Sequence, residues 1–161
     1  MMHTPFHITK VAVKAAQDLQ ADSIASIGGG NTVGLGKAVS VRSDLPHICV
    51  PTTYAGSRMT PILGETTDGT KTTKTTQKDV ALLPVAVFYD ISLTMSLPAE
   101  ISLTNGIDAV AHTVEALYAP NTNLILRLQA REGMGALSQA LLMIVNSLQD
   151  SEARTKALYG A

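Results

Sequence analysis

Three stretches of this sequence combine residue types that binding and catalysis use. The first is a glycine run and the polar residues after it: Gly28, Gly29, Gly30, Asn31, Thr32 and Val33. The second is a threonine-rich stretch that begins at Pro51, and the third places Asp108 four residues before His112. Glycines let the backbone approach a phosphate, while an acid beside a histidine can orient a substrate or hold a metal ion. The sequence therefore offers a candidate anion site and a candidate catalytic pair.

The glycine run lies between an apolar stretch at residues 23–27 and a stretch with helical spacing at residues 31–40. A strand that leads through glycines into a helix presents backbone amides and a helix N-terminus to a pyrophosphate. The spacing is neither G-x-G-x-x-G nor that of the P-loop, whose lysine precedes Ser or Thr. The residues alone leave two interpretations open, an anion-binding turn and a tight structural turn.

Hydrophobic periodicity predicts the elements that must position these groups. A helix with one buried face is predicted at residues 8–19, and strands are predicted at 23–27, 47–50 and 85–89. A strand, a helix and a second strand in succession indicate a parallel sheet. Residues 51–79 are rich in threonine and predict a loop followed by a hairpin, with Asp68-Gly69 as its turn.

Beyond Pro98 the pattern becomes entirely helical, with helices expected at 99–118 and 124–148 and from residue 150 onward. Gly133 and Gly135 mark an interruption or a close approach in the second of these helices. In the first, Asp108, His112 and Glu115 share one face, where a hydrogen-bonded pair and part of a metal site are the alternatives. An apolar stripe also runs along this first helix: Ile107, Val110, Ala111, Val114 and Leu117.

The predicted fold class is α/β followed by all-α, with a partial parallel-sheet dinucleotide-binding domain over residues 1–96 and a partial helical substrate or metal domain over 97–161. Composition supports a globular protein: 45% of the residues are hydrophobic, 16% are charged, and the net charge is −1. The Lys and Arg residues are scattered, which argues against a nucleic-acid surface, and no basic amphipathic or long apolar segment predicts a membrane contact. Cys49 is the single cysteine and is expected to be a small buried residue in a reducing compartment.

Longer motifs connect the three stretches to one family. The glycine run resembles the phosphate loop of the iron-containing alcohol dehydrogenase superfamily, and Gly34-Leu35-Gly36-Lys37-Ala38 after it is similar to the maleylacetate reductases. Pro51-Thr52-Thr53-Tyr54-Ala55-Gly56-Ser57 resembles the family's Pro-Thr-Thr loop, and Asn105 to Tyr118 resembles its metal-site helix. Two departures stand out. Asn31 replaces the usual Ser, which is expected to keep a polar cap, and Arg58 replaces the usual Glu.

The resemblance implies roles for individual residues. NAD or NADP would bind through its pyrophosphate to the glycine run, from Gly28 to Val33, together with Thr52 and Thr53. The reactive end of the cofactor would be lined by Ser57, Thr60 and Lys74, with Lys71 as the competing assignment to Lys74. Asp108 and His112 would be catalytic by orienting the substrate, or would supply two of the four ligands of an iron or zinc ion. Because no histidine follows His112, tight metal binding is not expected.

The implied reaction is reduction of a small carboxylic acid by NAD(P)H, such as maleylacetate to 3-oxoadipate in the degradation of aromatic compounds. The implied fold has a dehydroquinate synthase-like helical domain, and the implied enzyme is cytoplasmic and could form a homodimer. The alternatives are a metal-dependent alcohol dehydrogenase of the same superfamily and a non-catalytic remnant. Family members are longer at both ends, so the chain is expected to be an internal fragment without the residue that distinguishes NAD from NADP.

Overall fold

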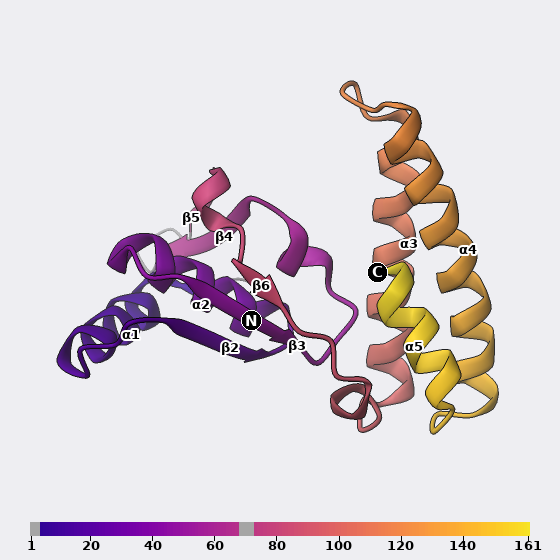
Figure 1. The fold of residues 1–161 in the computed structure, drawn as a ribbon, viewed down its shortest axis with the longest axis horizontal. Helices are drawn as coiled ribbons and strands as arrows, with labels where there is room; N and C mark the ends of the chain where they lie inside the picture. The colour runs from indigo at the N-terminus through magenta and orange to yellow at the C-terminus, as the bar shows by residue number, and fades with distance from the viewer. Residues whose placement is uncertain (1–3, 68–72) are drawn as a thin grey trace. The chain divides into compact units, whose positions relative to one another are not determined.

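In the computed structural model, residues 4–67 and 73–161 are described, and the chain divides into two compact units (Figure 1). The first unit is drawn from Met1–Pro51 and Ser57–Phe88, and the second from Thr52–Gly56 and Tyr89–Ala161. Parallel strands and helices build the first unit, and helices dominate the second, as the predicted fold class requires. The assignment of residues 1–96 and 97–161 to separate functional domains stays a prediction.

One sheet of the first unit is parallel and has the strand order β2-β3-β6. It consists of β2 (Ile24–Gly28), β3 (His47–Pro51) and β6 (Ala86–Val87), and α2 (Gly30–Ser43) connects the first two. This confirms the predicted strand–helix–strand unit. The third strand is shorter than the predicted 85–89, although the flanking amides of Val85 and Phe88 still donate to carbonyl oxygens of β3 at 2.8 Å.

The second sheet of this unit contains the predicted hairpin. Strands β4 (Ile62–Thr67) and β5 (Thr73–Lys78) are antiparallel, and the predicted turn at Asp68-Gly69 lies outside the described residues. A two-residue strand, β1 (Thr4–Pro5), pairs in parallel with β4. This strand was not among those predicted, because it is two residues long and pairs with a segment about sixty residues away in the sequence, so it leaves no periodic pattern.

The first helix, α1 (Phe6–Asp18), does not bury the apolar stripe that its spacing predicted. Val11 is 67% exposed and Leu19, just beyond the helix, is 79% exposed, whereas Thr9 is fully buried. Thr9 lies inside because its hydroxyl has a buried partner in the neighbouring strand. A polar contact, rather than the apolar periodicity, thus sets which face of this helix packs inward.

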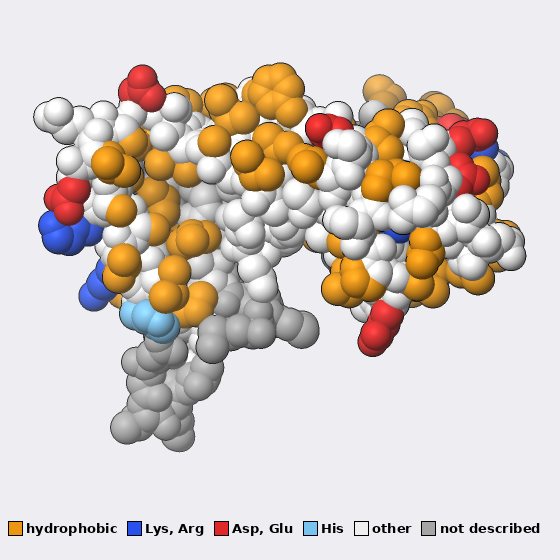
Figure 2. Space-filling model, turned by 90° about the horizontal axis from the view of Figure 1, so that it is seen from below, with side chains coloured by type: hydrophobic (Ala, Val, Ile, Leu, Met, Phe, Trp, Pro, Cys, Tyr) orange, Lys and Arg blue, Asp and Glu red, His pale blue; other side chains and the backbone are white. Residues whose placement is uncertain are grey.

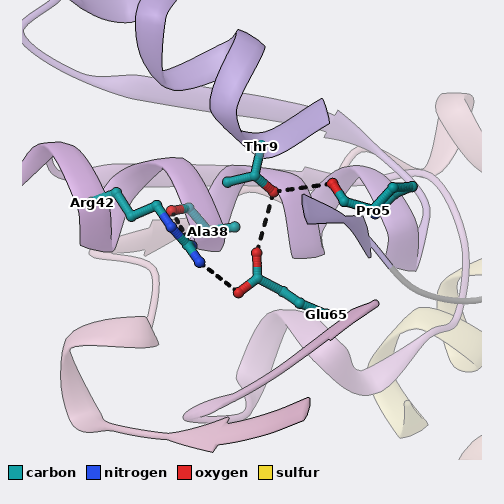
Figure 3. A network of polar contacts seen from close by, with 5 residues as sticks. All are labelled: Pro5, Thr9, Ala38, Arg42 and Glu65. Carbon is teal, nitrogen blue, oxygen red and sulfur yellow. Dashed lines mark hydrogen bonds and ion pairs between the residues drawn. The ribbon is translucent and has the colours of Figure 1, made fainter. Parts of the chain in front are cut away.

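That contact belongs to a polar network that ties α1, α2 and β4 together (Figure 3). Thr9 donates its hydroxyl hydrogen to Glu65 Oε1 at 3.2 Å, while Arg42 Nη2 donates to Glu65 Oε2 at 2.7 Å. Arg42 also reaches the carbonyl oxygen of Ala38 one turn earlier in α2 at 3.0 Å. The Glu65 side chain is only 8% exposed, so its charge is balanced mainly by this arginine.

Glu65→Gln should lower the free energy of unfolding by about 1–3 kcal/mol, because it removes the charge that pairs with Arg42 while keeping the size of the side chain. Urea unfolding followed by circular dichroism measures this loss. Glu132→Gln, at an exposed position of α4, is the matched control and should change stability by less than about 0.5 kcal/mol. If both variants unfold at the same urea concentration, the charge of Glu65 in this network contributes nothing to stability.

The second unit packs three helices side by side (Figure 1): α3 (Ala99–Tyr118), α4 (Leu124–Asn146) and α5 (Ser151–Gly160). Side-chain caps fix where two of them begin: Asn123 accepts a hydrogen bond from Leu126 N, and Asp150 accepts one from Ala153 N, both at 3.0 Å. One buried cluster in the core of this unit contains Tyr54, Ala140, Ile144, Ala153, Ala157 and Leu158.

Small residues bring these helices close together. A Cβ added at Gly133 would lie 2.9 Å from the carbonyl oxygen of Gly160, so α4 and α5 approach through their glycines. Gly135 has open space instead, and α4 continues through both glycines without interruption. The face of α3 that packs inward carries Ser102, Gly106 and Ala109 rather than the predicted apolar stripe, whose Ile107 is 61% exposed.

Large hydrophobic side chains are exposed in both units. On the face drawn in Figure 2, hydrophobic side chains gather in several clusters, and acidic and basic side chains are dispersed among them. In the second unit, Tyr118, Leu124 and Leu142 are each at least 70% exposed. None of the described helices has the length and apolar content that a bilayer crossing requires.

Candidate functional site

The glycine turn joins the end of β2 to the start of α2. Gly28 has a φ of 157°, and a Cβ added there would lie 2.5 Å from Thr32 Oγ1, so the turn is wound too tightly for a larger residue. The N-cap of α2 is Gly29, and no side chain of the described residues caps this helix end. The first backbone N–H groups of a helix have no partner within the helix. The start of α2 is therefore suited to an anionic group such as a pyrophosphate.

Asn31 does not act as the cap that the sequence predicted. It is the second residue of α2 and is exposed, because the N-cap is Gly29, two residues before Asn31. Thr32 is exposed beside it, whereas Val33 is only 2% exposed and packs into the unit. Val33 can therefore offer a ligand its backbone but little of its side chain.

Ser57 and Thr60 lie in the same unit, in and just after a short 3-10 helix, η1 (Gly56–Met59). The backbone carbonyl oxygens of both residues accept hydrogen bonds from the Lys37 ammonium of α2. Ser57 Oγ is buried and has no hydrogen-bond partner among the described residues. An unpartnered buried hydroxyl is costly, which fits a group that completes its hydrogen bonds on a bound molecule. The structure thus links two candidate cofactor residues to the glycine-turn helix.

A buried polar group lies beneath the glycine-turn helix. Ser26 Oγ and His47 Nε2 are 2.5 Å apart, and a Cβ added at Gly36 would clash with the His47 ring. Burial, and next the charge of Lys37, lower the pKa of His47, while burial raises the pKa of the Cys49 thiol. Cys49 is fully buried, so it is a packing residue, as predicted, and not a nucleophile.

Arg58, which stands where the family usually has Glu, is 1% exposed. Its charge acts on the buried thiol of Cys49, where it opposes the rise in pKa that burial causes. The guanidinium thus lies within the first unit and does not extend from its surface.

Lys74 lies on β5 opposite Thr66, and its side chain is exposed. This strand belongs to the β1-β4-β5 sheet, not to the sheet that carries the glycine turn. Its competitor, Lys71, lies outside the described residues. The assignment of Lys74 to the cofactor stays a prediction.

Thr52 and Thr53 belong to the second unit, where the neighbouring Tyr54 anchors their loop. Tyr54 is fully buried in the helical core, and its hydroxyl accepts a hydrogen bond from Arg154 Nη1 at 2.9 Å. The same Arg154 nitrogen donates to Ser102 Oγ at 2.7 Å. The two threonines are half-buried beside this anchor, so a buried arginine of α5 sets the position of the loop.

The second unit also carries the predicted Asp108 and His112 pair, on α3. His112 Nε2 lies 3.7 Å from Asp108 Oδ2, and His112 Nδ1 lies 3.6 Å from Glu115 Oε2. All three side chains are about two-thirds exposed, so a substrate could reach them. Within residues 4–67 and 73–161, three or more ligating side chains do not gather anywhere in a way that could hold a metal ion. Among the described residues, Asp108 and His112 therefore lack the further ligands of a closed metal site.

We expect no tightly bound divalent metal in the purified chain, because two protein ligands leave an ion coordinated mainly by water. Elemental analysis of chelator-treated, metal-repleted and desalted protein checks this expectation. Near-stoichiometric iron or zinc in the wild type, lost in His112→Ala and kept in His7→Ala, would contradict it. That result would favour a metal-dependent alcohol dehydrogenase.

Comparison with known proteins defines the class to which this fold and these motifs belong. Residues 2–91, which are 90 of the 161 residues, match the family model described as iron-containing alcohol dehydrogenase. The chain therefore belongs to the iron-containing alcohol dehydrogenase family.

Within that family the chain is similar to maleylacetate reductases. The enzyme of Rhizobium sp. (strain MTP-10005) is 50% identical over 160 residues, and that of Sphingobium indicum is 49% identical over the same length. The crystal structure of maleylacetate reductase from Agrobacterium tumefaciens superposes with a TM-score of 0.95 at 48% identity. Each comparison covers 99% of this chain but only 45% of the relative. The chain thus spans less than half the length of these relatives.

Proposed function

We propose that this chain forms the nicotinamide-cofactor turn and part of the substrate side of a maleylacetate reductase. The observation that carries the proposal is the similarity to these enzymes, which extends over 160 residues and includes every candidate site residue. The uncapped start of α2 after the glycine turn gives the similarity a physical basis. The proposed setting is the cytoplasmic degradation of aromatic compounds, by an enzyme that could be a homodimer.

Some residues of the chain would bind the cofactor, and others would orient its reactive end. The backbone from Gly28 to Val33 would hold the pyrophosphate through the N–H groups of the first turn of α2. Thr52 and Thr53 would add hydroxyl contacts, while Ser57, Thr60 and Lys74 would line the reactive end. The bound nicotinamide supplies the hydride, and the protein supplies position and electrostatics.

Asp108 and His112 would act on the substrate, a small carboxylic acid. The carboxylates of Asp108 and Glu115 lie 3.7 and 3.6 Å from the two ring nitrogens of His112, and a histidine beside carboxylates suits a group that hydrogen-bonds a substrate oxygen or moves a proton. An exposed histidine on a rigid helix meets the first requirement of such a role, which is access to the substrate.

A chimera tests the proposal directly. The matched 160-residue segment of the Rhizobium relative is replaced by this chain, and oxidation of NADH and of NADPH is measured with maleylacetate. The proposal predicts turnover within about tenfold of the parent enzyme, and the ratio of the two rates shows which cofactor is preferred. A chimera that folds and binds NADH but shows no turnover would support the non-catalytic alternative.

A further inference from the structure

The buried lysine of α2 has an unusual set of partners. Lys37 is 1% exposed, and its ammonium donates to the backbone carbonyl oxygens of Ser57, Thr60 and Ile62. The Thr60 and Ile62 oxygens lie 2.5 and 3.1 Å from Nζ. None of its hydrogen-bond or ion-pair partners within the described part of the chain is a carboxylate. A buried charge normally requires pairing or several hydrogen bonds, and here three carbonyl groups fulfil that need.

All three carbonyl groups belong to one short segment, residues 57–62. The segment contains the end of η1 and the start of β4, and it includes the candidate cofactor residues Ser57 and Thr60. Lys37 lies in the second turn of α2, whose first turn forms the candidate pyrophosphate site. One side chain thus joins the two candidate cofactor-binding parts of the first unit.

We propose that Lys37 is a positioning residue that holds segment 57–62 in the conformation that receives the cofactor. The role in cofactor binding rests on the proposed function, whereas the restraint on the segment rests on the geometry alone. Three donors on a single ammonium can satisfy three carbonyl oxygens that do not bond to one another, which a neutral side chain of this length cannot do.

The charge state of Lys37 gives this restraint a dependence on pH. Burial lowers the pKa of Lys37 to about 8, and the coulombic influence of Cys49 opposes that shift. The lysine is therefore mainly charged at pH 7 and mainly neutral at pH 9. If the segment opens and Lys37 becomes hydrated, its pKa returns toward 10.5, so opening takes up a proton and should become less favourable between pH 7 and pH 9.

Other titratable groups around α2 do not reproduce this change. On β3, the pKa of His47 is lowered, so it is neutral throughout, and the pKa of Cys49 is raised. Arg58 of η1 also belongs to this unit. The carboxylate of Glu65 in β4 accepts hydrogen bonds from Arg42 and Thr9. The carboxylate of Asp79 caps the short 3-10 helix η2 (Val80–Leu82) and accepts a hydrogen bond from Ala81 N. From α1, Lys10 lies over the Phe6 ring, and Lys14 pairs with Asp18.

Amide hydrogen exchange tests the restraint itself. The Thr60 amide donates to Ser57 O, and the Asp79 amide donates to Pro61 O at 3.0 Å, so both amides report on the segment. Lys37→Met should reduce their protection factors at pH 7 by about tenfold or more, because hydrogen bonds from a charged donor are stronger than those between neutral groups. Lys14→Met, at an exposed lysine of α1, should leave them unchanged.

An internal reference separates positioning from general destabilisation. The Ile24 amide donates to Pro46 O at 2.8 Å in the same unit but away from the segment. Its protection should be the same in Lys37→Met and wild type. An equal loss at Ile24, Thr60 and Asp79 would overturn the proposal, because Lys37 would then stabilise the unit as a whole.

Cofactor titration at pH 7 and pH 9 completes the test. Lys37→Met should bind NADH more weakly than wild-type protein at both pH values, whereas Lys14→Met should bind as wild type does. Should Lys37→Met fail to fold, judged by circular dichroism, the protection factors of wild-type Thr60 at the two pH values decide instead, and they should be higher at pH 9. Unchanged protection at pH 9 would overturn the proposal. If wild-type protein does not bind NADH at all, the proposed function fails, and the exchange data still decide whether Lys37 restrains the segment.

Discussion

Arg154→Leu is expected to lower the free energy of unfolding by at least about 3 kcal/mol, because it leaves several buried polar groups without partners at once. Arg154 is fully buried and donates to the Tyr54 and Ser102 hydroxyls and to the carbonyl oxygens of Leu97 and Leu148. These groups come from four separate segments of the second unit. A domain of ordinary size is stable by about 5–15 kcal/mol, so the loss is a large part of the total.

Thermal and urea unfolding by circular dichroism measure this effect. Arg131→Leu removes a guanidinium from an exposed position of α4 and should change stability by less than about 0.5 kcal/mol. Tyr54→Phe removes one partner of Arg154 and should cost about 1 kcal/mol. Arg154→Leu protein that unfolds together with wild type would show that the arginine does not hold the Tyr54 loop.

His112→Ala should lower kcat for maleylacetate reduction by about a hundredfold or more in the chimera, the usual scale of a lost proton-transferring group. The imidazole is exposed and lies within 4 Å of the carboxylates of Asp108 and Glu115. Since the histidine is proposed to act on the substrate and not on the cofactor, the dissociation constant of NADH should change by less than about twofold.

Steady-state kinetics and NADH titration of the same protein separate these effects. His7→Ala, at an exposed histidine of α1, is the matched control and should keep the kcat of the chimera. A His112→Ala chimera with unaltered kcat would remove this residue from the catalytic assignment. Equal losses in kcat and in NADH affinity would instead point to a disturbed fold.

The sequence predicted those parts of the fold that rest on local pattern. The βαβ unit follows from apolar strands on either side of a glycine-started helix, and its two longer strands lie within one residue of the predicted bounds. The pairing of Thr4–Pro5 with β4 was missed, since only tertiary contact specifies a strand of two residues. The buried faces of α1 and α3 were also misjudged. Thr9 and Gly106 pack inward because of specific partners, Glu65 and Leu141, that no periodicity reveals.

The motifs of the candidate site could be predicted from the sequence, but the buried residues that hold its loops in place could not. Lys37 bonds to segment 57–62 in the first unit, and Arg154 bonds to Tyr54 of the Pro-Thr-Thr loop in the second. Neither residue was assigned a supporting role from the sequence. The sequence feature that could have indicated these buried charges is a charged residue on a helix face whose other residues are small or apolar. Lys37 follows Val33 by one turn, and Arg154 lies between Ala153 and Ala157. Such a residue is buried only if distant carbonyl or hydroxyl groups converge on it, which the sequence does not show.

The most direct test of dinucleotide binding by the glycine turn is a titration of the chain with NADH, followed by nicotinamide fluorescence. Wild-type protein should bind, and Gly30→Val should weaken binding by at least about tenfold, because a branched side chain at the first residue of α2 obstructs approach to the backbone N–H groups. Gly135→Val, at a helical glycine with open space around it, is the matched control and should bind as wild type does. Equal NADH affinity of wild type and Gly30→Val would show that the glycine turn is structural and that the cofactor, if bound, lies elsewhere.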